Sequence, residues 1–295
     1  MSTAFPPPVC FIHVPKTAGT SMAALLARHY DDRMVSRSRL VFDLGADPDE
    51  ARYRLWHGHY GVGDIAPFLP PGTRFVTSLR DPVHRVVSLY HYWRNVDLAF
   101  YHHTRETDPN YDGVMLAVGC QGLDEFLATD DPSILREISD AQTRYLVGSL
   151  LEPGPVSAEQ ALDRIIEREI VVVRQAHFAS DTPDAVEALL GVRPRAAEVP
   201  HLNTHSYQVR VTPAQRARIL ALNGQDLVLC READRLAASA PARPRKVRSA
   251  HGERSRGAAQ GRPGGAGRRV AQAARRLVRE GLYRRQPVPH PGPQA

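Results

Sequence analysis

Residues 11–21 read FIHVPKTAGTS, and this stretch decides the fold. The apolar segment 9–14 predicts a buried strand, which ends at Pro15. A loop of small and polar residues follows, and the segment 22–27 predicts a helix. In such a strand-loop-helix unit the backbone N–H groups at the helix start converge, and the helix dipole adds partial positive charge there. The stretch therefore predicts a site that binds a phosphate or sulfate group.

The side chains of the loop support an anion site. Lys16 supplies a full positive charge, and three hydroxyl side chains supply hydrogen-bond donors. The predicted site comprises Lys16, Thr17, Ala18, Gly19, Thr20 and Ser21. The Walker A pattern is absent, because the lysine precedes the single glycine of the loop, and this argues against an ordinary ATPase or GTPase. The alternative is that the loop only turns the chain, as small-residue loops do in many α/β proteins.

Apolar runs alternate with helical patterns along the rest of the chain. Further strands are predicted at 74–79 and 170–173, while residues 51–59 lead into a loop at 61–72. Helices are predicted from residue 83, at 123–127, 134–146 and 157–169, from a cap at 182–184 to residue 190, and at 212–238. The segment 100–113 is predicted as a surface loop. Strands separated by helices indicate an α/β fold with a parallel sheet and helices on both faces.

The end of the chain differs in composition from the rest. Residues 241–295 carry 14 basic and 2 acidic residues, a net charge of +12, whereas residues 1–240 carry 24 basic and 30 acidic residues, a net charge of −6. We therefore expect a folded domain at 1–240 that does not bind nucleic acid. The Arg, Pro and Gly content of 241–295 predicts a mostly disordered tail. Within it, 268–285 could form a short basic amphipathic helix that contacts a membrane or an anionic partner, or it could be a solvated segment.

The cysteines and the apolar segments indicate the compartment in which the protein works. Cys10, Cys120 and Cys230 are far apart and odd in number, so they form no metal-binding cluster and favour a reducing compartment. The N-terminus has no signal-peptide pattern, and no segment reaches the ~20 apolar residues of a membrane span. We expect a cytoplasmic protein whose chemistry needs no metal.

A second motif repeats the arrangement of the first. Residues 80–88 read RDPVHRVVS, and they follow the second predicted strand and open a helix. Arg80 can bind a phosphate through two N–H groups, and Ser88, about two helical turns later, could reach the same ligand. Alternatively, Arg80 pairs with Asp81 and Ser88 is a solvated helix residue.

Together the two motifs resemble those of sulfotransferases that use PAPS (3′-phosphoadenosine 5′-phosphosulfate). The loop at 16–21 is similar to the family's 5′-phosphosulfate loop, and residues 80–88 are similar to its 3′-phosphate motif. The resemblance is strongest to the branch of heparan sulfate 2-O-sulfotransferase, the uronyl 2-O-sulfotransferases and many bacterial relatives, and it runs intermittently from residue 9 to 235. It implies a sulfotransferase fold with a P-loop-like sheet, PAPS as cosubstrate, and a carbohydrate or glycolipid hydroxyl as acceptor.

The segment 54–60, RLWHGHY, resembles the family's His-Gly-His segment. The resemblance implies His59 as the catalytic base, His57 as a supporting residue, and Lys16 as a catalytic cation. A neutral imidazole with a pKa near ~6.5 suits the removal of a hydroxyl proton. We expect His57 and His59 to point in opposite directions, so that only one faces the acceptor. The alternative is that both are ordinary surface or core histidines, and metal binding by the pair lacks an apparent third ligand.

Two weaker matches and one departure complete the comparison with that family. Residues 141–148, AQTRYLVG, are similar to a segment near the acceptor and cofactor, and residues 201–205, HLNTH, are similar to a late loop that closes over PAPS. Residues 173–177, VRQAH, replace the family's usual Gly-Leu/Val-Thr-Glu, so no acceptor contact is carried over there. Two other functions stay open: a nucleotide-binding phosphotransferase, and an inactive PAPS-fold binding protein that acts through its basic tail.

Overall fold

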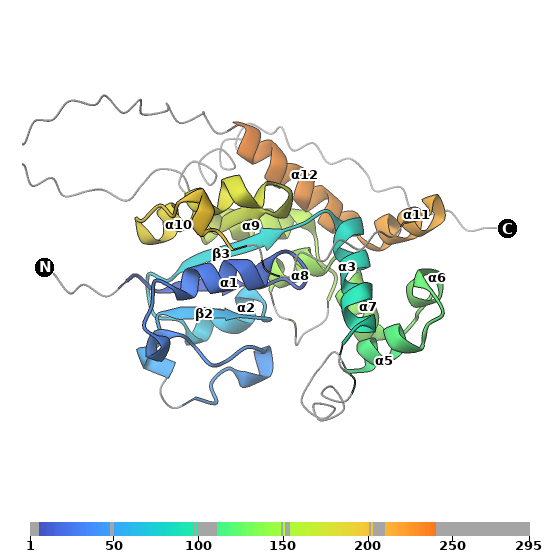
Figure 1. Ribbon diagram of the computed structural model, residues 1–295, viewed down its shortest axis with the longest axis horizontal. Helices are drawn as coiled ribbons and strands as arrows, with labels where there is room; N and C mark the ends of the chain where they lie inside the picture. The colour runs from blue at the N-terminus through green and yellow to red at the C-terminus, as the bar shows by residue number, and fades with distance from the viewer. Residues whose placement is uncertain are drawn as a thin grey trace, which may run out of the picture.

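A parallel sheet lies at the centre of the protein (Figure 1). The computed structural model describes residues 6–47, 50–96, 98, 111–148, 150, 154–200, 202 and 210–239. Within these residues the sheet has four strands: β1 (Val9–Ile12), β2 (Leu55–Gly58), β3 (Arg74–Leu79) and β4 (Val171–Arg174). Their order across the sheet is β2-β1-β3-β4. The predicted tail at 241–295, with its segment 268–285, lies outside the described residues.

Helices cover both faces of the sheet, as the sequence predicts. One face packs against α1 (Gly19–Ala27) and α10 (Phe178–Leu190). The strands contribute five buried apolar side chains to this face, Val9, Phe11, Leu55, Val76 and Val173. The opposite face, which includes Cys10, Trp56 and Phe75, packs against further helices. These are α2 (Val62–Ile65), α8 (Ala141–Val147), α9 (Ala158–Glu167) and α12 (Gly224–Ser239). The α/β class with a parallel sheet is therefore confirmed.

A separate helical cluster lies beyond one end of the sheet (Figure 1). It contains α3 (Pro82–Arg94), α5 (Tyr111–Gly119), α6 (Leu123–Leu127), α7 (Pro132–Ile138) and α11 (Pro213–Leu222). Short 3₁₀ helices in the connections are η1 (Asp32–Met34), η2 (Val41–Asp43), η3 (Glu50–Arg52), η4 (Ala66–Phe68), η5 (Gln175–His177) and η6 (Ala196–Glu198). Because α3 continues directly from β3, this cluster stands at the carboxyl ends of the strands.

The structure corrects several of the predicted boundaries. The segment before His59 is strand β2, and α1 begins at Gly19 rather than at residue 22. The helix predicted at 134–146 is two helices, because Asp140 adopts a left-handed conformation with a φ of 45°. The helix predicted at 212–238 also divides, because the Asp140 carboxylate accepts hydrogen bonds from the N–H groups of Gln225 and Asp226 and so caps a new helix start.

The helix α10 also begins before the predicted cap and contains Pro183. The carboxylate of Asp181 accepts the backbone N–H of Arg174, and the Ser180 hydroxyl donates to the carbonyl of His177. These bonds hold the first turn of α10. Pro183 is the sixth residue of the helix, so the helix continues past it without the hydrogen bond that its N–H would have made.

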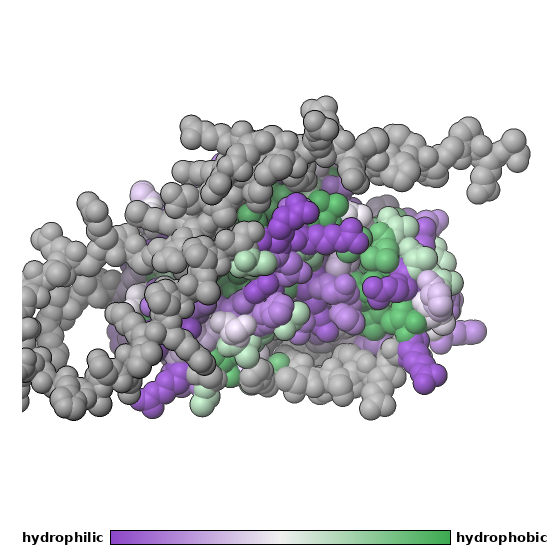
Figure 2. Space-filling model, turned by 90° about the horizontal axis from the view of Figure 1, so that it is seen from above, coloured by the Kyte–Doolittle hydropathy of each residue, from purple (hydrophilic) through white to green (hydrophobic). Residues whose placement is uncertain are grey.

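Helix α12 presents a polar outer side. Leu229 and Leu236 are buried, whereas Arg231, Asp234 and Arg235 are exposed. Seen from above, the middle of the described surface is largely hydrophilic, with hydrophobic side chains gathered toward one end (Figure 2). In the described part of the chain, every helix is too short or too polar to cross a lipid bilayer.

Candidate anion-binding site

The site lies where the chain changes direction across the sheet. The connection after β1 leads to β2 on one side, and the connection after β3 leads to β4 on the other. In open α/β sheets, ligands bind in the crevice outside the carboxyl ends of two such strands. Here the two strands are β1, followed by the loop at 15–18, and β3, followed by Arg80. The topology therefore brings the two predicted motifs to the same edge.

The loop after β1 is held in an unusual backbone conformation. Lys16 and Ala18 have φ values of 69° and 73°, in the left-handed region that non-glycine residues rarely adopt. Thr17 lies between them and is fully buried. Its hydroxyl donates to the carbonyl of Val14 at 2.8 Å and shares a 2.8 Å hydrogen bond with the hydroxyl of Ser78 on β3. The Thr17 side chain thus fixes the loop to the sheet, and such constrained backbone is typical of ligand sites.

The start of α1 packs closely against the residues that follow strand β1. Ala18 is the N-cap residue and its methyl side chain cannot accept a hydrogen bond, so it leaves the first N–H groups of the helix to other partners. A Cβ atom at Gly19 would lie 1.9 Å from the His13 imidazole, which explains the glycine. The Ser21 hydroxyl accepts the N–H of Leu202 at 3.0 Å, whereas the Thr20 side chain is exposed. Residue 202 therefore lies over this helix start.

Lys16 and Arg80 form the cationic part of the site. The Arg80 Nη1 donates to the Lys16 carbonyl at 3.0 Å, and the Lys16 ammonium lies 4.0 Å from the centre of the Tyr92 ring. Within the described residues neither cation forms an ion pair with a carboxylate, and Asp81, the residue after Arg80, accepts the N–H of His84 and so caps α3. Two cations that lack carboxylate partners at one sheet edge favour an anionic ligand.

Burial and like charge weaken the protonation of these two cations. Burial, together with the charge of Arg80, lowers the pKa of Lys16 to about 8. Burial also lowers the pKa of Arg80, where the charge of Asp81 acts in the opposite direction. An anion bound between them would restore the protonated form of Lys16.

Ser88 is on the second turn of α3 and is 9% exposed. The hydrogen bonds of the described residues do not connect it to Arg80 or to the loop at 15–18. Its place in a phosphate site stays a prediction from the motif.

The His59 ring is oriented by the backbone of β1. His59 Nδ1 lies 2.8 Å from the carbonyl oxygen of His13, and the two rings are 4.4 Å apart between centroids. A carbonyl oxygen only accepts, so this Nδ1 carries the proton and the lone pair of the neutral ring is on Nε2. The arrangement fits a base that removes a proton through Nε2.

The expectation that His57 and His59 point in opposite directions is wrong. Residues two apart on an extended strand lie on the same side of a sheet. His57 is in register with Phe11, the His13 ring stacks on Phe11 at 5.3 Å, and the His59 ring lies against His13. The three imidazoles therefore share the side of the sheet that α1 covers.

Burial holds two of the three imidazoles in the neutral form. Burial, with the charges of Arg39 and His59, lowers the pKa of His57 to about 4. Burial, with the charges of His59, His57 and Lys16, lowers the pKa of His13 well below its usual value. A general base works best with a pKa near the operating pH, so His57 suits a supporting role.

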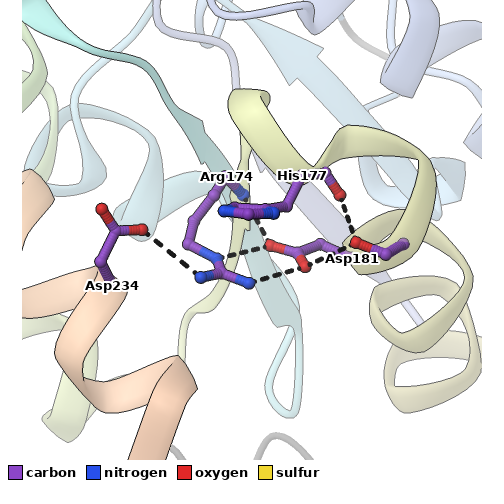
Figure 3. A network of polar contacts seen from close by, with 5 residues as sticks. Arg174, His177, Asp181 and Asp234 are labelled. Atoms are coloured by element: carbon purple, nitrogen blue, oxygen red, sulfur yellow. Dashed lines mark hydrogen bonds and ion pairs between the residues drawn. The ribbon is translucent and has the colours of Figure 1, made fainter.

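Arg174, at the carboxyl end of β4, is already neutralised by carboxylates. Its Nε and Nη2 donate to Asp181 of α10 at 2.8 and 2.9 Å, and its Nη1 lies 3.4 Å from Asp234 of α12 (Figure 3). The side chain is 22% exposed. Arg174 thus ties two helices to the sheet, which separates its role from that of Lys16 and Arg80.

Three residues that lie near the site were not predicted as site residues from the sequence. His13 and Tyr92 contact His59 and Lys16, and Gln142 bonds to the backbone of Arg80. The resemblance at 141–148 marked the segment of Gln142, and the motif at 80–88 marked Arg80, but no local pattern paired the two. In the predicted late loop only residue 202 is described, so the other residues of 201–205 lie outside the described residues. Within the described residues, no three His, Cys, Asp or Glu side chains are placed to hold a metal ion.

The comparisons with known proteins identify no family for this chain. No protein-family model matches the chain, and no curated protein matches it.

Proposed function

We propose that the protein is a PAPS-dependent sulfotransferase of the carbohydrate type, acting on a sugar or glycolipid hydroxyl. One observation carries the proposal. Lys16 and Arg80, joined through the Lys16 carbonyl, meet at the switch point of the sheet without an ion-pair partner among the described carboxylates, and His59 follows the neighbouring strand β2 with its Nδ1 on the His13 carbonyl, which makes Nε2 the basic nitrogen of the neutral ring. A sulfotransferase-type P-loop-like fold is part of the same proposal.

Different residues of the chain remove the proton, stabilise the developing charge and bind the cosubstrate. PAPS supplies the sulfuryl group for direct in-line transfer. His59 Nε2 accepts the proton of the acceptor hydroxyl as the new O–S bond forms, and the bond from sulfur to the phosphate oxygen breaks. Lys16 and the N–H groups at the start of α1 stabilise the negative charge that develops on that oxygen. Arg80, with Ser88 by resemblance, holds the 3′-phosphate.

Calorimetric titration with PAP, the desulfated product, and with ATP tests this function. We expect PAP to bind without Mg²⁺ and much more tightly than ATP, because the two cations match a bisphosphate and the loop lacks a Walker A pattern. Binding should be accompanied by transfer of label from PAPS to an acceptor in extracts of the native cell. Tight ATP binding that needs Mg²⁺ would indicate a phosphotransferase, and PAP binding without any transfer would indicate the inactive binding protein.

The affinity for PAP should fall as the pH rises through about 8. The lowered pKa of Lys16, caused by burial beside Arg80, means that the free protein loses this charge below the usual lysine range. Because a bound anion favours the ammonium form, affinity should weaken by up to ~10-fold per pH unit above that pKa. Titrations between about pH 7.5 and 9.5 measure this, since the second ionisation of a phosphate group, with a pKa of about 6, is nearly complete there.

The variant Lys16→Arg is the matched control for the pH dependence. Arginine stays protonated throughout this range, so the PAP affinity of the Lys16→Arg variant should stay nearly constant with pH. An equally flat profile for the unmodified protein would show that Lys16 does not contribute its charge to the bound anion.

A further inference from the structure

Gln142 bonds to both backbone groups of Arg80. Its Oε1 accepts the Arg80 N–H at 2.8 Å, and its Nε2 donates to the Arg80 carbonyl at 2.9 Å. Gln142 belongs to α8 and is fully buried. The thiol of Cys230 on α12 donates to the same carbonyl at 3.3 Å. Arg80 has left strand β3, so the amide replaces the ladder partners that a strand residue would have.

Asp226 of α12 holds Gln142 in turn. Its Oδ2 accepts the backbone N–H of Gln142 at 3.1 Å and the side-chain Nε2 at 3.3 Å. Its Oδ1 accepts the N–H and the hydroxyl of Thr143, both at 2.8 Å. Asp226 is fully buried, and within the described residues it has no ion-pair partner. A buried carboxylate that is satisfied only by such donors fixes them strongly, because any unmade bond is costly.

We propose that Gln142, held by Asp226, is a positioning residue that aims the Arg80 guanidinium at the 3′-phosphate of PAPS. The inference rests on the proposed function. Fixing the two peptide groups of Arg80 fixes the direction in which its side chain leaves the sheet, and that side chain reaches the Lys16 carbonyl at 3.0 Å. Through this contact the same amide also supports the backbone of the anion-binding loop. The helix α12 thereby becomes part of the donor site, although it lies far from both motifs in the sequence.

The readout is the preference for PAP over AMP, because AMP lacks the 3′-phosphate that Arg80 is proposed to bind. We expect Gln142→Met, which keeps the side-chain size and removes both side-chain hydrogen bonds to Arg80 as well as the one to Asp226, to lower the ratio of the two affinities by ~10-fold. Arg80→Ala gives the full loss of preference for comparison. A residue that only fills the core would change the melting temperature and leave this ratio unaltered.

Gln225→Met is the matched control. Gln225 is also a glutamine that bonds to backbone, accepting the N–H of Ala158 at 2.9 Å, but it supports α9 rather than Arg80. It should keep the PAP preference, and it should cost less stability than Gln142→Met because Gln225 is only half-buried. If Gln142→Met does not fold, Gln142→Asn replaces it, since the amide is then one methylene too short to span both groups of Arg80.

The outcomes separate the two proposals. Absence of a PAP preference in the unmodified protein contradicts the sulfotransferase assignment, whatever Gln142 does. A preference that survives in the folded Gln142 variant to within about twofold overturns the positioning role alone. A selective loss in the Gln142 variant, with Gln225→Met unchanged, supports it.

Discussion

Replacing Lys16 by alanine should lower sulfuryl transfer by ~10²–10³-fold, the cost of removing one preorganised donor from a developing oxyanion. The Lys16 ammonium belongs to a loop whose left-handed backbone is fixed by Thr17 and by Arg80, so the loop is held in place before an anion binds. The measurement is the rate at which label from PAPS appears in the product formed with native-cell extract.

The sequence offers an unusually clean control for Lys16. Lysine occurs only at positions 16 and 246, so Lys246→Ala removes the other lysine of the chain. That variant should keep its transfer rate, while Lys16→Ala should still fold with an unchanged melting temperature to within a few degrees, about the effect of 1 kcal/mol. Retention of more than about a tenth of the rate by Lys16→Ala would remove Lys16 from the chemical step.

Replacing His59 by alanine should reduce turnover by ~10²–10⁴-fold, because general-base catalysis contributes that much. The carbonyl of His13 fixes the tautomer of His59, so the loss should concern kcat far more than the affinity for PAP. The measurement is the transfer rate across the pH range, in which the fall at acidic pH should disappear together with the base.

Two other histidines serve as references for His59. His57→Ala should reduce turnover much less, because burial and the charge of Arg39 already lower the pKa of His57 to about 4 and keep its ring neutral. His177→Ala should have no effect, because this exposed side chain lies beside β4 and its hydrogen bond to Ser180 uses only its carbonyl. If His57→Ala were the more damaging variant, the roles of the two histidines would be reversed.

The local parts of the site were predictable from the sequence. An apolar strand, a small-residue loop and a helix at 9–27 are a pattern within one window, and the same holds for residues 74–94. Strand β2 was missed because its sequence, LWHG, lacks β-branched residues and ends in glycine, which is depleted in strands. The error in the directions of His57 and His59 came from applying the wrong strand period, since the side-chain period is two residues.

The contacts between the two motifs could not be predicted from local sequence patterns. Arg80 meets Lys16 across 64 residues of chain and Gln142 across 62, and Asp226 meets Gln142 across 84. No pattern in any one segment encodes these pairs, because strand order and helix packing create them. The break at Asp140 has the same origin, since its carboxylate caps a helix more than 80 residues away.

The lowered pKa of Lys16, which burial and the nearby Arg80 cause, also makes this residue a chemical target. Near neutral pH a much larger fraction of its amine is unprotonated than at an ordinary lysine, and an unprotonated amine is a nucleophile. With only one other lysine in the sequence, an aldehyde or activated ester carried on an adenosine phosphate would be directed to a single position. The cation that we propose to hold the anion is thus also the point at which such a reagent would attach covalently.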